Sequence, residues 1–232
     1  MENDRKVKLP GTLNPPIHVF LKDLRSELRT RYALNALLMF VITTLSIILF
    51  SIGNESVSEE VLCGVLWIVI FFAAMSGLSR TFVAEEERGT VMTLHLIARP
   101  MAVYVGKLLL NLVLLSLINL FTIVLYVLLI TNFQVRNVAI FAVTMVLGTI
   151  GLASAATIIA AIISKANTKG TLYPVLSFPI LLPLLMTGIN ATKIAVVGAQ
   201  FSEAMSEFQI LIAYTIAINA VSYLLFEFIW KE

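Results

Sequence analysis

The chain has 232 residues, 59% of them hydrophobic and 13% charged, and its mean hydropathy is +0.96. Soluble domains are about 45–50% apolar and about one quarter charged, so the composition excludes a water-soluble single domain. The net charge of +2 is too small and too scattered for a nucleic-acid-binding surface, and no nucleic acid is expected as a partner. One cysteine, Cys63, and two histidines leave no internal disulfide and no metal site of the zinc type.

Residues 1–31 form a positively charged amino-terminal segment. They contain seven Lys or Arg and no apolar run typical of a removable signal peptide. Between residues 17 and 31, apolar and basic side chains follow helical spacing on opposite sides, which predicts an amphipathic helix at the membrane surface. A charged flank that only fixes the topology is the alternative. The apolar positions are Ile17, Phe20, Leu21, Leu24 and Leu28, and the basic positions are Lys22, Arg25, Arg29 and Arg31.

Residues 32–232 are predicted to form an all-α transmembrane domain of six helices. A bilayer core about 30 Å thick requires about 20 mainly apolar residues per helix, because every backbone amide must bond internally there. The charged residues divide the chain into six stretches of this kind, none of which contains Asp, Glu, Lys or Arg. The expected spans are 32–54, 61–79, 108–130, 138–164, 171–192 and 208–226.

The connections between the spans alternate in their Lys and Arg content. Residues 1–31, 80–107, 165–170 and 227–232 together hold fourteen, whereas the other connections hold only Arg136 and Lys193. Positively charged residues stay on the cytoplasmic side, so both termini are predicted to be cytoplasmic in a bacterial inner membrane. The loop 55–60, with three Glu and no basic residue, is predicted to lie outside.

The connection 80–107 is the long cytoplasmic loop and the candidate working surface. Its polar run predicts that one helix ends at Gly89 and that a short helix begins with Thr90 as the N-cap, before Pro100. Such a helix suits docking of a cytoplasmic partner, and a solvated, charged turn is the alternative. The run consists of Glu85, Glu86, Glu87, Arg88, Gly89 and Thr90.

Several kinds of chemistry are missing from the sequence. No phosphate-binding loop is present, so the chain is not expected to bind ATP, and no catalytic motif indicates an enzyme. The spans lack ionisable residues, which argues against an ion-coupled carrier. Lys107 and Glu227, just at the ends of spans, are interpreted as snorkelling anchors.

The fourth and fifth predicted spans have unusual compositions. The fourth is rich in small residues, which allow helices to approach closely. The fifth contains Pro174, Pro179 and Pro183, each of which removes an amide donor, so a kinked or broken helix is predicted. With the external segment 194–208 these prolines suggest an outer gate or lid, and a purely structural kink is the alternative. The small residues are Gly148, Gly151, Ala153, Ser154, Ala155, Ala156, Ala160 and Ala161.

These features resemble the membrane subunits of ABC-2 type transporters, and more narrowly the haem exporter protein B (CcmB) family of cytochrome c maturation. The ABC-2 resemblance rests on Phe82-x-x-Glu85 followed by Gly89-Thr90, a pattern that opens the coupling helix in that class. Met92 departs from the acidic or amide residue usual at that place. The CcmB resemblance rests on Val65-Leu66-Trp67, Ser79-Arg80-Thr81-Phe82, Gly106-Lys107, Leu147-Gly148-Thr149-Ile150-Gly151, and the run from Leu172 through Pro174 and Phe178-Pro179 to Pro183.

The resemblance implies an ABC-2, or type V exporter-like, fold and a set of partners. These are a second copy of the chain, two cytoplasmic ATP-binding subunits, a haem-handling membrane protein and a periplasmic haem chaperone, with ATP and haem held by the partners. Both histidines are predicted to be cytoplasmic, so no axial ligand pair for haem is apparent, although Met186 and Met205 stay open as ligands.

The function predicted from the sequence is that of a permease-type subunit in cytochrome c maturation. It would couple ATP hydrolysis by a partner to release or handover of the haem-loaded chaperone. Two alternatives remain: an ABC-2 permease that exports a lipid, glycan or drug, and a scaffold that is indifferent to ATP. Because exposed ion pairs are weak, Gly89→Pro is predicted to harm activity more than any single Glu→Ala change among residues 85–87.

Overall fold

A computed structural model describes residues 15–53, 55, 57–79, 81–82, 85, 89, 94, 99–165 and 169–231. Throughout these residues the chain is helical, with short connections and no strand, so the prediction of an all-α fold is confirmed. The helices are α1 (Pro15–Thr30), α2 (Tyr32–Ile52), α3 (Glu59–Leu78), α6 (Pro100–Leu129), α7 (Val138–Ser164), α8 (Lys169–Val197) and α9 (Met205–Lys231), with a 3-10 turn, η1 (Phe201–Ala204), before α9.

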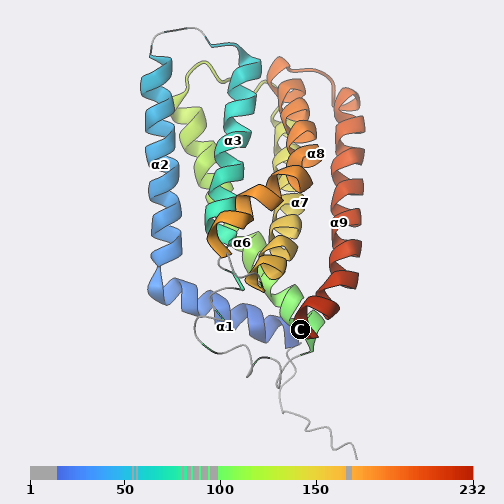
Figure 1. The fold of residues 1–232 in the computed structure, drawn as a ribbon. Helices are drawn as coiled ribbons and strands as arrows, with labels where there is room; N and C mark the ends of the chain where they lie inside the picture. Colours follow the sequence, from blue (N-terminus) through green and yellow to red (C-terminus); the bar gives the residue numbers. More distant parts are fainter. Residues whose placement is uncertain are drawn as a thin grey trace, which may run out of the picture.

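The described helices form an upright bundle with one helix laid across its end. Figure 1 shows α2, α3, α6, α7 and α9 running in a common direction, while α1 lies across the end at which the chain also finishes. Within the described residues, six helices are long and apolar enough to cross a membrane. The predicted amphipathic helix therefore exists as α1, and its position at a membrane surface remains a prediction.

Two helices extend well beyond the apolar stretches that predicted them. The third spanning helix, α6, begins at Pro100 rather than at 108, after Arg99 in an extended conformation. Proline suits the first position of a helix because its missing amide hydrogen would have no partner there. α6 thus places Lys107 two turns inside the helix, and the sixth spanning helix begins at Met205 rather than 208.

The packing centre of the bundle is Trp67 of α3. Its ring is buried between Gly148 of α7 and Gly188 of α8, and a Cβ on either glycine would collide with it. The indole Nε1 donates to Thr192 Oγ1 at 2.9 Å. The small residues of the fourth span thus permit close helix packing, as their spacing predicts.

A methyl group at Gly188 is expected to destabilise the bundle. In Gly188→Ala the new Cβ would lie 2.5 Å from the Trp67 ring, so we expect the free energy of unfolding to fall by about 1–3 kcal/mol. Thermal unfolding of the detergent-solubilised protein measures this effect. Gly64→Ala on α3 is the matched control, because its added Cβ would enter open space beside the helix. Equal melting of both variants would contradict the packing role of Gly188.

The fifth spanning helix, α8, is one uninterrupted helix from Lys169 to Val197, but it is bent. Figure 1 shows its first part running obliquely and its second part running upright beside α7. Pro179 and Pro183 are exposed, and the Tyr214 hydroxyl of α9 donates to the carbonyl of Ile180, between the two prolines, at 3.0 Å. The predicted kink is therefore present, but α8 is one bent helix rather than two half-helices.

Candidate functional site

The segment between α3 and α6 is described only at a few positions. Thr81, Phe82, Glu85, Gly89 and Leu94 are described, together with Arg99 at the start of α6. The predicted coupling residues Glu86, Glu87, Arg88 and Thr90 lie outside the described residues, as does most of the short helix expected there. The candidate site is therefore built from the residues that fasten this segment to the bundle.

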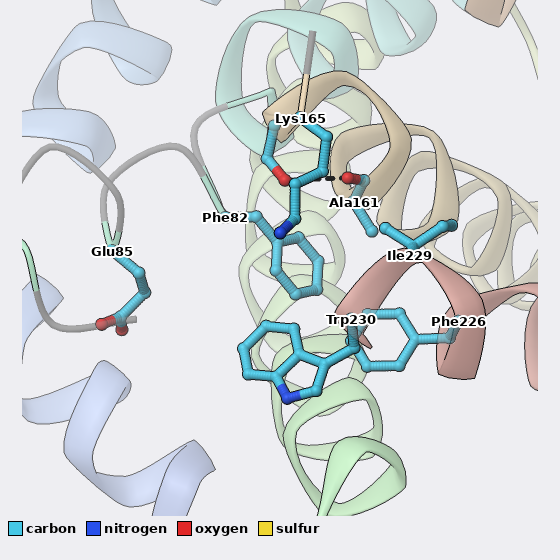
Figure 2. Close-up of a pocket in the computed structure, with 8 residues that line it drawn as sticks. Phe82, Glu85, Ala161, Lys165, Phe226, Ile229 and Trp230 are labelled. Atoms are coloured by element: carbon cyan, nitrogen blue, oxygen red, sulfur yellow. Dashed lines mark hydrogen bonds between the residues drawn. The ribbon is translucent and has the colours of Figure 1, made fainter. Parts of the chain in front are cut away.

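An aromatic cluster holds the beginning of the segment. The buried ring of Phe82 lies 5.7 Å from the Phe226 ring of α9, centroid to centroid. Phe226 also contacts Tyr104 of α6 at 5.0 Å and stacks on Trp230 at 5.5 Å. Figure 2 shows Phe82, Phe226 and Trp230 around a small pocket with Glu85 apart from the rings. The beginning of the segment between α3 and α6 is therefore fixed to the bundle by the aromatic contacts of Phe82.

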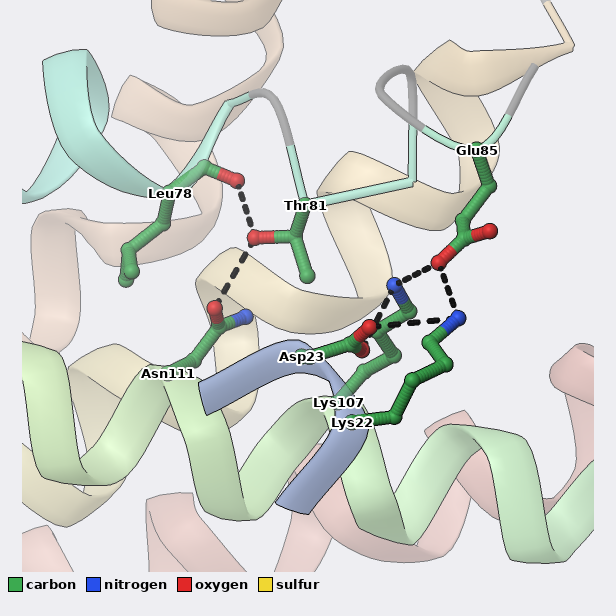
Figure 3. Close-up of polar contacts among 7 residues, drawn as sticks. All are labelled: Lys22, Asp23, Leu78, Thr81, Glu85, Lys107 and Asn111. Carbon is green, nitrogen blue, oxygen red and sulfur yellow. Dashed lines mark hydrogen bonds and ion pairs between the residues drawn. The ribbon is translucent and has the colours of Figure 1, made fainter. Parts of the chain in front are cut away.

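Three residues further on, Glu85 enters a cluster of four charges, which we call the charge cluster: Lys22 and Asp23 of α1, Glu85, and Lys107 of α6. The Lys107 ammonium lies 2.8 Å from Asp23 Oδ2 and 3.0 Å from Glu85 Oε1. The Lys22 ammonium lies 2.7 Å from Glu85 Oε1 and 3.3 Å from Asp23 Oδ1. Figure 3 shows the four side chains converging from three parts of the chain.

Three members of the charge cluster are almost fully buried. The side chains of Asp23, Glu85 and Lys107 are 9%, 8% and 3% exposed, whereas Lys22 is about half exposed. Among the residues that the structure describes, two positive charges in the cluster balance two negative charges, and such pairing is needed to keep ions in a dry environment. Removal of one buried partner would leave an unpaired charge in a dry environment, which is strongly unfavourable. The ion pairs therefore hold Glu85 in place relative to α1 and α6.

Hydrogen bonding and ion pairing also shift the titration of Lys22. Burial acts to lower the pKa of this ammonium, but the hydrogen bond to Glu85 and the charges of Asp23 and Glu85 outweigh it, and the pKa is raised above its ordinary value. A raised lysine pKa stabilises the folded state at pH values below the ordinary value. That contribution is lost only when the pH rises through the raised pKa, well above neutrality.

The contact between α1 and α6 uses a different side of α1 from its apolar stripe. Among the described side chains of α1, those of Val19 and Asp23, one turn apart, are buried. A Cβ added at Gly106 of α6 would lie 2.7 Å from Val19 Cβ and 2.8 Å from the carbonyl oxygen of Pro16. Glycine at this position therefore lets α1 approach α6 closely enough for Asp23 to reach Lys107.

A second polar connection lies one turn further along α6. The Thr81 hydroxyl is 2.8 Å from Asn111 Oδ1, and Asn111 Nδ2 donates to Thr157 Oγ1 of α7 at 2.9 Å. Asn111 is completely buried. Lys107 and Asn111, four residues apart, therefore present one face of α6 to the α3–α6 segment.

The structure corrects two sequence-based interpretations. Lys107 is not a snorkelling anchor, because its ammonium is buried beneath α1 and paired with two carboxylates. Glu85 is not an exposed side chain, and within this chain its carboxylate already has Lys22 and Lys107 as partners. The sequence pattern missed Asp23 and Lys107. A usable signal was Pro100, which starts α6 early enough to place Lys107 inside a helix.

The remaining predicted site residues lie as follows. Gly89 has a positive φ of 65°, a conformation that favours glycine and suits the predicted end of a helix. On α1, Phe20 is half-buried and Arg25 and Arg29 are exposed. The segment 194–208 comprises the end of α8, η1 and the start of α9, and its role as an outer lid remains a prediction. An outer gate at Pro174, Pro179 and Pro183 remains a prediction.

Comparison with known proteins decides the family. The profile of the family described as "CcmB protein" matches residues 16–228, nearly the whole chain. The chain belongs to the CcmB family. "Heme exporter protein B" of Bradyrhizobium diazoefficiens is 24% identical to this CcmB chain over 178 residues, which cover 76% of this chain and 80% of the relative. The CcmB match begins within α1, so it includes every element of the charge cluster.

Proposed function

We propose that this chain is the membrane subunit of a haem exporter complex that acts in cytochrome c maturation in a bacterial inner membrane. The family match and the relative named as a haem exporter protein support this assignment. Two copies of the chain would associate with two ATP-binding subunits, a haem-handling membrane protein and a periplasmic haem chaperone. The subunit itself would be non-catalytic, with ATP and haem bound by its partners.

The observation that carries the coupling role is the buried charge cluster. It connects the segment at Glu85 with α1 through Asp23 and with α6 through Lys107. When the ATP-binding subunits close, they would displace the segment between α3 and α6. Because Glu85 is fastened to both helices, the displacement would be transmitted to α1 and α6 rather than absorbed by a loop.

The expected consequence is a change at the opposite end of the bundle. Movement of α2, α3 and the bent helix α8 would alter the external surface formed by the end of α8, η1 and the start of α9. A packed bundle has discrete arrangements, so a small local shift becomes a larger rearrangement. The new external surface would release the haem-loaded chaperone.

Covalent haem staining of membranes tests the proposed function. A strain lacking this chain is expected to lose c-type cytochromes and to keep b-type haem proteins, and the wild-type chain should restore them. The Gly89→Pro variant, at equal membrane abundance, should not restore the c-type cytochromes. Unchanged c-type signal in the deletion strain would overturn the haem role and leave a general ABC-2 permease. Full rescue by Gly89→Pro would instead favour an ATP-indifferent scaffold.

A further inference from the structure

A sharp elbow centred on Arg31 joins α1 to α2. Arg31 adopts a left-handed conformation with a φ of 51°, which is uncommon for a residue with a Cβ. Its amide donates to the Glu27 carbonyl at 2.8 Å, and its carbonyl accepts from the Asn35 amide at 3.0 Å. The elbow is therefore held by the hydrogen bonds of both helices.

A groove of about 370 Å³ opens between this elbow and α6. This volume lies within the range typical of small-molecule sites. Its walls are apolar on both sides, and among the described lining residues the polar side chains are Arg31 and Asn35 at the elbow. The lining residues are Leu28, Arg31, Leu34, Asn35, Leu38, Leu117 and Ile118.

The charge at the elbow is positive. The exposed guanidinium of Arg31 has Nε 3.4 Å from the Leu28 carbonyl oxygen, and within the described part of the chain it makes no ion pair. Arg25 and Arg29 are exposed on the last two turns of α1. Glu27 is the acidic residue of these turns, and one of its carboxylate oxygens is buried. An anionic group would find uncompensated positive charge beside Arg31.

We propose that the groove binds an anionic phospholipid, with an acyl chain between α2 and α6 and the headgroup phosphate at Arg31. The elbow lies where the basic helix across the end of the bundle meets an apolar helix long enough to span a membrane. In a membrane crossed by α2, that junction would lie at the depth of the lipid phosphates, where basic residues attract anionic lipids by about 1 kcal/mol each. The groove supplies the apolar surface that a free phosphate ion would not use.

Native mass spectrometry of the full-length protein in detergent tests the site, with phosphatidylglycerol and phosphatidylethanolamine as probes. Wild type is expected to retain phosphatidylglycerol with about fivefold preference, and Arg31→Gly should lose that preference. Glycine accepts a positive φ, so this change relieves the elbow while removing the charge. Leu117→Trp, at an exposed position, should block the groove. Arg29→Gln, which removes an exposed charge outside the groove, is the matched control.

Four results would overturn the proposal. Equal retention of both lipids by wild type would show that the groove does not select an anionic headgroup. Equal loss in Arg29→Gln and Arg31→Gly would show diffuse attraction rather than a site. A dimer in the same spectra that dissociates in Leu117→Trp, with no lipid bound in wild type, would show that a second copy covers the groove. Glycerol phosphate is expected to leave the phosphatidylglycerol signal unchanged, and competition by it would assign the site to a free phosphate ester.

Discussion

Replacement of Lys107 by Met is expected to lower the free energy of unfolding by about 3–5 kcal/mol. The substitution keeps the approximate volume of the side chain but removes the buried ammonium that pairs with the carboxylates of Asp23 and Glu85. Within the charge cluster, the half-exposed Lys22 alone would still pair with them. Thermal unfolding in detergent should show a lower midpoint, by on the order of 10 °C.

Lys22→Met is the matched control for this prediction. It removes the same charge from the same cluster, but at a half-exposed position where ion pairs contribute about 1 kcal/mol or less. Similar midpoints for Lys107→Met and the wild type would contradict the buried pairing. A loss in Lys22→Met as large as that in Lys107→Met would show that burial does not distinguish the two lysines.

The double variant Asp23→Leu with Lys107→Met separates stability from coupling. It removes one negative and one positive charge together and leaves Lys22 paired with Glu85. Apolar residues of similar volume often replace a buried ion pair without loss of stability, so most of the melting temperature should return. Under the proposed function, c-type haem should remain low, because Glu85 is no longer fastened to α6.

Gly89→Pro is expected to abolish ATP-coupled activity. Proline fixes φ near −65°, whereas Gly89 has a φ of +65°, so the turn after Glu85 cannot form as it stands. A cost of about 3 kcal/mol would reduce the population of that turn on the order of a hundredfold. The measurement is ATPase activity of the assembled complex, with c-type haem staining as the cellular readout.

Gly53→Pro is the control, because it also replaces a glycine of positive φ by proline. Gly53 also has a positive φ, of 54°, but it follows α2 at the opposite end of the bundle from α1, and its amide donates to the Leu49 carbonyl. Asn accepts left-handed geometry, so the separate variant Gly89→Asn should keep the ATP-coupled activity that Gly89→Pro loses. Equal loss in Gly53→Pro and Gly89→Pro, at equal membrane abundance, would show that general strain rather than the α3–α6 segment is responsible.

The structure changes the expected ranking of the glutamates. The sequence-based prediction that each single Glu→Ala change is milder than Gly89→Pro assumes exposed ion pairs. Glu85 is buried and contacts two ammonium groups, so Glu85→Ala should also be severe. For Glu86 and Glu87, which lie outside the described residues, the original ranking stands as a prediction.

The sequence alone determines the membrane architecture of this protein. Long uncharged stretches and the hydrogen-bonding requirement of a bilayer interior permit little except spanning helices, so the all-α fold follows from composition and charge spacing. Helical periodicity located α1, and three prolines located the bend in α8. Periodicity and proline content are local properties of the chain, and they do not depend on which helices pack together.

Only the tertiary structure decided which polar residues meet. Lys107 at a span boundary looked like an anchor because sequence position shows distance from the charged loops but not what covers a side chain. Asp23 lies beside the apolar stripe of α1, and Gly106 lets that side of α1 reach α6. Pairing of Lys22, Asp23, Glu85 and Lys107 depends on contacts between residues up to 84 positions apart. Such contacts are set by helix packing, which a local pattern does not encode.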